Sequence, residues 1–341
     1  MSKMRKGTLV MLCVLVFGLF QSCASTAKGT SPEPTPTGAE MKANVSWPND
    51  KLEVDESGIP QLKVYVVEDE KIETVDVETY VQGVLAGEMK NDWPMEALKA
   101  QAILARTFVM KFVDEKTSRY EGADVSTDIE EAQAYDRSAV NERIEQAVEE
   151  TRGLVLGAAG ELPYAWFHAH SGGTTERAVT GLGWDKEEPG YTKVTQGNEP
   201  SSVENEKDQQ SLTDAQAWEA RFSVEEFAAA CAEQGVEVSV EEGTSLTVGE
   251  RGEGGRAKTL NVNGQPVQAA ELRIALGSTK MRSTLLTSLK VEDGQVYMAG
   301  KGYGHGVGMS QWGAYGMAEE GADAEEIVAH YFTDVTVEKL W

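Results

Sequence analysis

Over short stretches of the chain, the spacing of apolar residues changes between the two-residue period of strands and the 3.6-residue period of helices. Residues 62–69 and 71–77 alternate apolar and polar side chains and are rich in β-branched residues, which is typical of strands. The apolar positions then take helical spacing, and Asp76 is a suitable N-cap for that short helix. Pro94 occupies a first-turn position, so the pattern predicts a longer helix over about 95–113.

Shorter elements follow. Residues 141–151 have helical spacing, and the apolar runs 154–157 and 162–170 predict strands. Residues 245–268 contain two strand patterns around a Gly-rich turn, and a second turn follows at Asn263–Gly264. A two-residue Asn-Gly turn between apolar runs is a strong hairpin signal.

This mixture predicts an α+β fold. Residues 61–341 are long enough for one large mixed domain or for two closely packed subdomains. The acidic stretch 185–210 contains Gly and Pro and predicts an exposed loop. Cys231 lies in a helical pattern and is expected to be a small buried hydrophobic residue.

The N-terminus has the organisation of an exported protein. Basic residues precede an apolar run and then FQSC, ending at Cys23, so residues 1–22 are interpreted as a secretory signal. The apolar run is shorter than the roughly 20 residues of a spanning helix. FQSC resembles a bacterial lipobox, which would leave Cys23 as a lipid-modified first residue; ordinary cleavage is the alternative. Residues 23–60, with TSPEPTPTG, predict a flexible tether.

We therefore expect the folded part to be exported and to lie outside the cytoplasmic membrane. A lipid on Cys23 would anchor it to the outer face of the cytoplasmic membrane, or in the periplasm if the organism has an outer membrane. Removing residues 1–22 takes away Lys3, Arg5 and Lys6, which changes the net charge from −25 to −28. Such a charge argues against nucleic acid and anionic polymers as partners, because phosphate binding needs a basic surface. A neutral or partly cationic substrate fits better.

One acidic residue differs from the many that solvate the surface. Glu88 follows a short apolar helix and precedes a long one, in YVQGVLAGEMKNDWPMEALKAQAILART. An acid in this position suggests general acid–base chemistry. In the same block, Glu96 suits a helix N-terminus. Lys99 is a candidate substrate contact, and Arg106 is a candidate for either an internal ion pair or a substrate contact.

A second block, FHAHSGGTTE, contributes further candidates. His168 and His170 are two residues apart on an expected strand, so both side chains project from the same face. Such a pair is also half of a zinc site, but a bound zinc needs three or four ligands, and no Cys follows closely. We expect no cofactor. The turn after the pair offers backbone N–H groups and hydroxyls to sugars through Ser171, Gly172, Gly173 and Thr174.

A third block, GYGHGVGMSQWGAYGMA, alternates glycines with other residues. Alternate glycines let a neighbouring backbone or a sugar ring approach closely. An internal packing role and a direct role in a cleft both remain open for His305. The polar and aromatic cleft candidates of this block are Tyr303, His305, Ser310, Gln311 and Trp312.

Taken in order, these three blocks resemble the signature of the SpoIID/LytB family of exported cell-wall proteins. The resemblance implies a lytic transglycosylase that cuts peptidoglycan glycan between N-acetylmuramic acid and N-acetylglucosamine. Such an enzyme leaves a 1,6-anhydro end and prefers strands stripped of stem peptides. The catalytic glutamate of the family aligns on Glu88. LytB-type relatives imply an alternative, a glycan-binding protein that recruits a cell-wall amidase, and a purely structural envelope lipoprotein is a third class.

Overall fold

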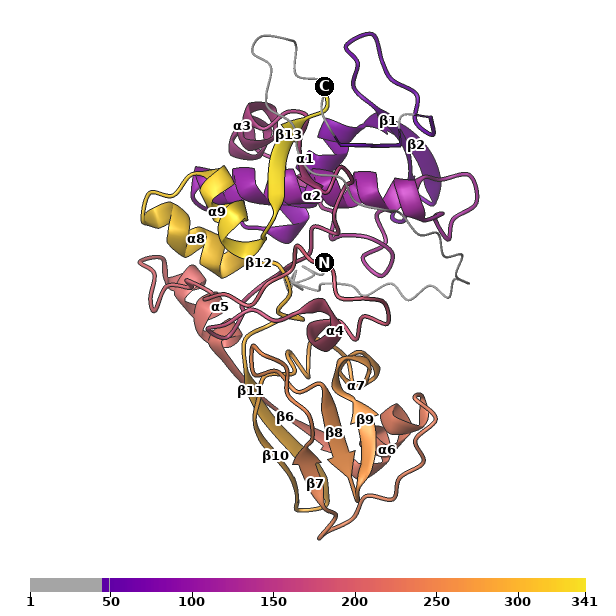
Figure 1. Ribbon diagram of the computed structural model, residues 1–341, viewed down its shortest axis with the longest axis vertical. Helices are drawn as coiled ribbons and strands as arrows, with labels where there is room; N and C mark the ends of the chain where they lie inside the picture. The colour runs from indigo at the N-terminus through magenta and orange to yellow at the C-terminus, as the bar shows by residue number, and fades with distance from the viewer. Residues whose placement is uncertain (1–44, 49) are drawn as a thin grey trace, which may run out of the picture.

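The computed structural model describes residues 45–48 and 50–341, which form two lobes with separate hydrophobic cores (Figure 1). The first lobe combines the indigo and magenta N-terminal part with the yellow C-terminal part. The second, orange lobe is built from residues 217–301. The expected α+β fold is confirmed. The second lobe is formed by an internal stretch of the chain, and the residues before and after that stretch build the first lobe.

The first lobe is organised around one long helix. Helix α2 contacts α1, α3, β4, α8 and α9, which places it at the centre of the lobe. Strand β1 pairs antiparallel with β2 and parallel with β3, while β4 pairs with the C-terminal strand β13. The elements are β1 (Gln61–Val66), β2 (Lys71–Asp76), α1 (Val77–Glu88), α2 (Met95–Glu115), β3 (Val125–Ser126), η1 (Arg137–Ala139), α3 (Glu142–Glu150), β4 (Leu154–Ala158), α8 (Gln311–Glu319), α9 (Ala324–Tyr331) and β13 (Val335–Lys339).

The second lobe contains two three-stranded antiparallel sheets, ordered β10-β11-β6 and β7-β8-β9. Phe222, Phe227 and Leu260 are fully buried in its core. Its elements are β6 (Ala217–Ser223), α6 (Val224–Ala232), β7 (Leu246–Val248), β8 (Thr259–Val262), β9 (Gln265–Gln268), α7 (Ala269–Ala275), β10 (Leu286–Glu292) and β11 (Gln295–Lys301).

Short elements connect the lobes. Strand β5 (Phe167–His168) pairs in parallel with β12 (Met309–Ser310), so the second and third sequence blocks lie side by side. Helices α4 (Ala178–Gly181) and α5 (Glu206–Gln216) complete this region. The blocks are therefore held where the two lobes meet.

Most local predictions are confirmed. Asp76 caps α1 by accepting a hydrogen bond from the backbone N–H of Thr79 at 2.8 Å. Pro94 immediately precedes α2, and Cys231 is buried in α6. The turn at Asn263–Gly264 has positive φ at both residues and joins β8 to β9.

Three expectations need correction. The strand expected over 162–170 is only two residues long, because Pro163 has no N–H and the Tyr164 N–H is bonded to the Tyr191 hydroxyl instead of a neighbouring strand. The stretch 185–210 is not uniformly exposed: Thr192 and Gly197 are buried, and the stretch runs into α5.

The folded region also begins before residue 61. Val45 and Leu52 are buried in the core of the first lobe, so the expected tether ends before residue 60. Within residues 45–48 and 50–341, no helix combines the length and apolar character needed to cross a membrane. The predicted signal, Cys23 and the first part of the tether lie outside the described residues.

Candidate active site

Glu88 is the last residue of α1 and is almost completely buried, with 3% of its surface exposed. Its Oε1 accepts a hydrogen bond from the backbone N–H of Ala134 at 2.7 Å. Its Oε2 is buried and has no hydrogen-bond partner within the described residues. One carboxyl oxygen is thus held by the backbone, and the other is buried without a hydrogen-bond partner.

Burial raises the pKa of Glu88 to about 8, although the Ala134 N–H and the nearby Gln311 amide both act to lower it. At neutral pH the carboxyl group is therefore mostly protonated. Because Oε1 already accepts the Ala134 N–H, the proton resides on Oε2. This is the protonation state that a general acid needs before it acts.

Two glutamine side chains lie beside Glu88. Gln311, the first residue of α8, donates from Nε2 to the backbone oxygen of Glu88 at 3.3 Å and to Oε1 of Gln101 at 3.4 Å. The remaining amide atoms, Gln311 Oε1 and Gln101 Nε2, are buried without partners. Buried polar atoms without partners carry a free-energy penalty, so a polar ligand that satisfied them would bind favourably here.

An aromatic group separates this cluster from a cavity. The rings of Trp93 and Trp312 lie 4.5 Å apart, and the Tyr315 ring is 5.2 Å from that of Trp93. Trp93 and Tyr315 also line a cavity of about 1030 Å³ between the α1–α2 loop, residues 198–205 and the end of α8. Glu88 does not line this cavity, but Trp93 contacts Trp312, which follows the Gln311 that bonds to Glu88.

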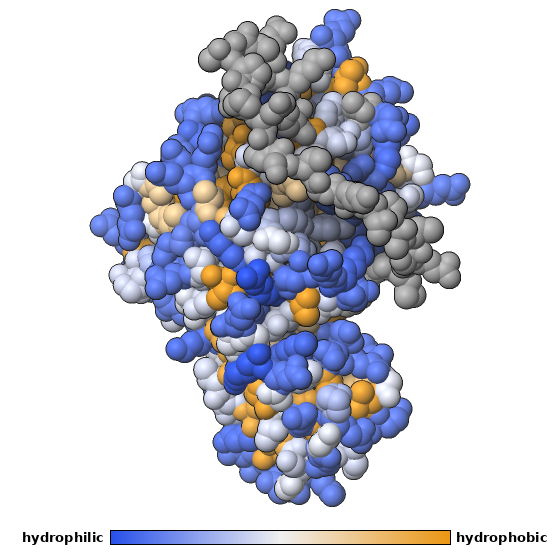
Figure 2. Space-filling model, viewed as in Figure 1, coloured by the Kyte–Doolittle hydropathy of each residue, from blue (hydrophilic) through white to orange (hydrophobic). Residues whose placement is uncertain are grey.

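The cavity is acidic. Carboxylates of Asp92, Glu204, Asp208 and Glu319 surround the Tyr315 hydroxyl, and together with burial, which has the largest effect, they raise its pKa. The face shown in Figure 2 is mostly hydrophilic, with scattered hydrophobic patches. An anionic polymer would be repelled from this cavity, whereas neutral or cationic groups would be accepted.

The two histidines of the second block are buried and uncharged. Burial lowers the pKa of both His168 and His170. His168 Nδ1 donates to the Val307 carbonyl at 3.1 Å, whereas His170 Nδ1 accepts from the Gly172 N–H at 2.9 Å. No group of three or more His, Cys, Asp or Glu suited to a metal ion occurs in the part of the chain that the structure describes.

The turn after the histidines is used internally. The N–H of Ser171 donates to Glu199, that of Gly172 to His170, and that of Gly173 to the Ser171 hydroxyl. These N–H groups are therefore not available to sugar hydroxyls as the sequence suggested. Thr174 forms a bridge to Gln196 and is partly exposed.

Sequence reasoning missed Glu199, which lay in the stretch predicted to be exposed. Its side chain is 5% exposed, and Oε1 accepts from the Ser171 N–H at 2.6 Å and from the Ser310 hydroxyl at 2.8 Å. His170 Nδ1 lies 3.6 Å from the same oxygen. Glu199 links the second and third blocks, and the local sequence gave no sign of this because both partners are distant along the chain.

The glycines of the third block serve internal packing. Gly302, Gly304, Gly306 and Gly308 all have positive φ. A side chain at Gly306 would lie 1.9 Å from Nε of Arg256. His305 is buried beside them, its Nδ1 accepts the Val307 N–H at 3.0 Å, and burial lowers its pKa to about 3. For His305, the interpretation as an internal packing residue is favoured.

The remaining candidates have structural positions. Arg106 is fully buried and pairs with Glu78 at 2.5 Å, so it is an internal ion pair and has no surface for a substrate. Lys99 pairs with Glu96 and Glu150 on the surface of α2. Tyr303 is partly buried and bridges His170. The structure therefore gathers Glu88, Gln311 and Trp312 at one site and the histidines and Ser310 at a neighbouring one.

The fold and this site define an α+β protein with a buried acid, Glu88, at the end of helix α1 in the first of the three sequence blocks. Residues 67–157, which include Glu88, match the family described as Stage II sporulation protein, and residues 187–308 match a domain of unknown function. The chain belongs to the SpoIID family.

Relatives extend over most of the chain. The chain is 32% identical to Stage II sporulation protein D of Bacillus amyloliquefaciens, over 80% of its own length and 77% of the relative's. It is 30% identical to an uncharacterized protein of Brachyspira hyodysenteriae, over 78% of its own length and 67% of the relative's. It is also 29% identical to the Amidase enhancer of Bacillus subtilis, over 75% of its own length and 40% of the relative's.

Proposed function

We propose that this chain is an exported peptidoglycan lytic transglycosylase in which Glu88 acts alone as acid and then base. Membership of the SpoIID family and similarity to an amidase enhancer support a function related to the cell wall. The observation that carries the proposed reaction is Oε2 of Glu88. It is the single carboxyl oxygen of the described residues that is buried without a partner.

The proposed reaction requires one carboxyl group. The proton on Oε2 passes to the glycosidic oxygen while the bond from this oxygen to C1 of N-acetylmuramic acid breaks. The 6-hydroxyl oxygen of the same sugar then bonds to C1, and its proton passes to the Glu88 carboxylate. The products are a 1,6-anhydro end and a free hydroxyl on the leaving N-acetylglucosamine, and no water is consumed. Hydrolases generally need a second carboxyl group to activate water or to attack carbon.

Because Glu88 is buried, substrate binding requires a local movement of the protein. The segment from Ala132 to Ala134 is buried, and its last residue donates to the Glu88 carboxyl. Because Oε2 is buried, a glycan can reach it only after residues around it move, and the segment bonded to Oε1 is one candidate for this movement. The unpartnered atoms of Gln101 and Gln311 would then be available to the hydroxyl and acetamide groups of the sugar.

Digestion of purified peptidoglycan, with and without prior amidase treatment, tests the reaction. Mass analysis should find anhydro ends released by the native protein and none by Glu88→Gln. Anhydro ends made equally by the variant would refute the role of Glu88, and reducing ends would indicate a hydrolase. Glu121→Gln, an exposed glutamate outside the site, is the matched control.

A second candidate function comes from the Amidase enhancer relative. Under it, the chain would bind glycan and recruit an amidase without cutting. The same digestion separates the two functions, because glycan that is bound but uncut, and cut faster by an added amidase, supports the enhancer.

Lipid anchoring at Cys23 is part of the proposal. Cys23→Ser should move the protein from the membrane fraction to the soluble exported fraction. Unchanged membrane association of this variant would refute anchoring through that residue.

A further inference from the structure

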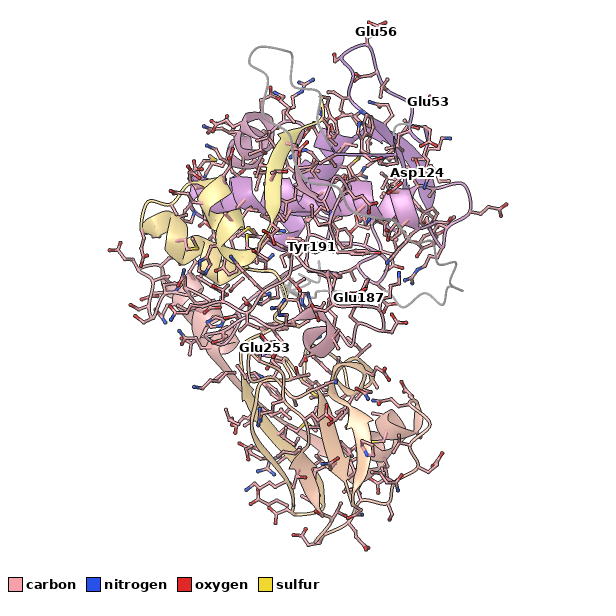
Figure 3. All side chains as sticks on the ribbon, viewed as in Figure 1. Glu53, Glu56, Asp124, Glu187, Tyr191 and Glu253 are labelled. Atoms are coloured by element: carbon pink, nitrogen blue, oxygen red, sulfur yellow. The ribbon has the colours of Figure 1, made fainter. Side chains whose placement is uncertain are left out.

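An aromatic cavity lies apart from the site described above. Tyr164, Trp184 and Tyr191 line a cavity of about 310 Å³ and are only partly buried. Tyr191 and Glu187 lie near the middle of the face shown in Figure 3, above α4. A cavity of this size is at the lower end of the range for small-ligand pockets, about 300–1,000 Å³. It is too small for a folded partner.

The rings form an ordered platform. Tyr164 stacks on the buried Trp166, with ring centres 5.0 Å apart and planes inclined by 9°. Trp184 meets both rings edge-on, at 5.0 Å and 5.2 Å. Trp166 therefore supports the partly exposed rings from beneath, which fixes the orientation of the platform.

Two lysines and a glutamate contact the rings of the platform. Lys111 lies over the Tyr164 ring at 5.2 Å and pairs with Glu115 at 2.7 Å, and Glu115 also accepts the Tyr164 hydroxyl. Lys186 lies over the Trp184 ring at 5.4 Å. Burial alone would raise the pKa of Glu115, but the hydrogen bonds from Lys111 and Tyr164 outweigh it and hold the pKa below its usual range. The cavity thus offers both donors and an ionised acceptor.

This combination suits a sugar ring. The C–H face of a pyranose packs on an aromatic face, while its hydroxyl and acetamide groups hydrogen-bond to the charged side chains that line the same cavity. The cavity is lined by two lysines and by Glu115, Glu161 and Glu187, so its charge is nearly balanced, unlike the acidic cavity beside Trp93. Balanced charge favours a neutral glycan unit over an anionic polymer.

Helix α2 connects the cavity to the Glu88 site. Helix α2 carries Gln101 beside Glu88 and Lys111 in the aromatic cavity, ten residues apart, which corresponds to about 15 Å along the helix axis. A few units of an extended glycan cover such a distance. We propose that the cavity formed by Tyr164, Trp184 and Tyr191 is a distal subsite for an N-acetylated amino sugar of the glycan strand; this rests on the proposed function.

Binding of N-acetylglucosamine oligomers of increasing length to the full folded chain tests the subsite. The measurement is made by calorimetry in the Glu88→Gln background, where nothing is cut. Trp184→Ala should weaken binding of the long oligomers about tenfold, and Trp184→Phe should restore most of it. The matched control is Tyr297→Ala, which removes a partly exposed ring of the second lobe that also has cations over it.

Equal affinities of Trp184→Ala and the control for the long oligomers would overturn the subsite. If Trp184→Ala does not fold, Lys186→Ala makes the test, because Lys186 is exposed and its removal leaves the rings in place. Here a severalfold loss of affinity is expected, and no loss would overturn the proposal. Trp184-dependent binding without any glycan cutting by the native protein would refute the proposed reaction and keep the subsite. If cutting depends on Glu88 but binding does not depend on Trp184, the proposed reaction stands and the subsite is refuted.

Discussion

Replacing Glu88 by glutamine should stabilise the protein increasingly as the pH rises. The folded-state pKa of Glu88 is about 8, against an ordinary value of 4.5. Between these values the folded protein binds a proton that the unfolded chain releases, so the free energy of unfolding of the native protein falls as the pH rises through this window. At about 1.4 kcal/mol per pH unit, the loss reaches about 5 kcal/mol above pH 8. Glutamine does not ionise and can still accept the Ala134 N–H.

Urea denaturation of the native protein and of Glu88→Gln, across pH 4.5 to 9, measures this effect. The stability difference between the two proteins should be small at the acid end and should widen by several kcal/mol at the alkaline end. The exposed Glu121→Gln variant should follow the native curve. If the native and Glu88→Gln curves stay parallel, Glu88 is not a buried acid with a raised pKa, and the argument for its protonated state fails.

The rate of glycan cutting should fall about tenfold per pH unit above about pH 8, since Glu88 must be protonated to act; a rate that stays constant beyond pH 9 would exclude Glu88 as the acid. Glu78→Gln should lower the free energy of unfolding by about 3–5 kcal/mol in urea titrations, because it leaves the buried Arg106 without its partner; a loss below 1 kcal/mol would contradict this. Gly313→Ala should lower the melting temperature, since its Cβ would lie 1.9 Å from the Gly197 carbonyl oxygen. Gly190→Ala, with no atom within 4 Å, should leave the melting temperature unchanged, and equal effects of the two would count against the close packing.

Local pattern was sufficient for much of the fold. Three features depend on residues within a few positions of one another and could be predicted from the local sequence. They are the hairpin of β8 and β9, the cap at Asp76 and the start of α2. The division into two cores depends on pairings such as β6 with β11, whose partners are more than seventy positions apart. Periodicity carries no information about which distant strands pair.

Because periodicity does not identify distant partners, the sequence predicted only part of the site. The sequence places Glu88 at a helix end. Its carboxyl group, however, accepts the N–H of Ala134, and its backbone oxygen accepts the amide of Gln311, which lies more than two hundred positions away. Glu199 was hidden for the same reason. At the turn after the histidines, the partner of the Ser171 N–H is the distant Glu199, which only the fold brings near, whereas Gly172 and Gly173 bond to side chains two residues before them.

The acidic residues show why tertiary structure decides function here. The chain has 56 acidic residues, and within residues 45–48 and 50–341 five of them are buried. The other four have charged or hydrogen-bonding partners: Glu78 pairs with Arg106, Asp208 pairs with Lys90, Glu131 accepts the Ser118 hydroxyl, and Glu176 accepts backbone N–H groups of the second lobe. In the part of the chain that the structure describes, Oε2 of Glu88 is the one buried carboxyl oxygen without a hydrogen-bond partner, and burial raises the pKa of this group. A single available proton favours a reaction in which the substrate supplies its own nucleophile.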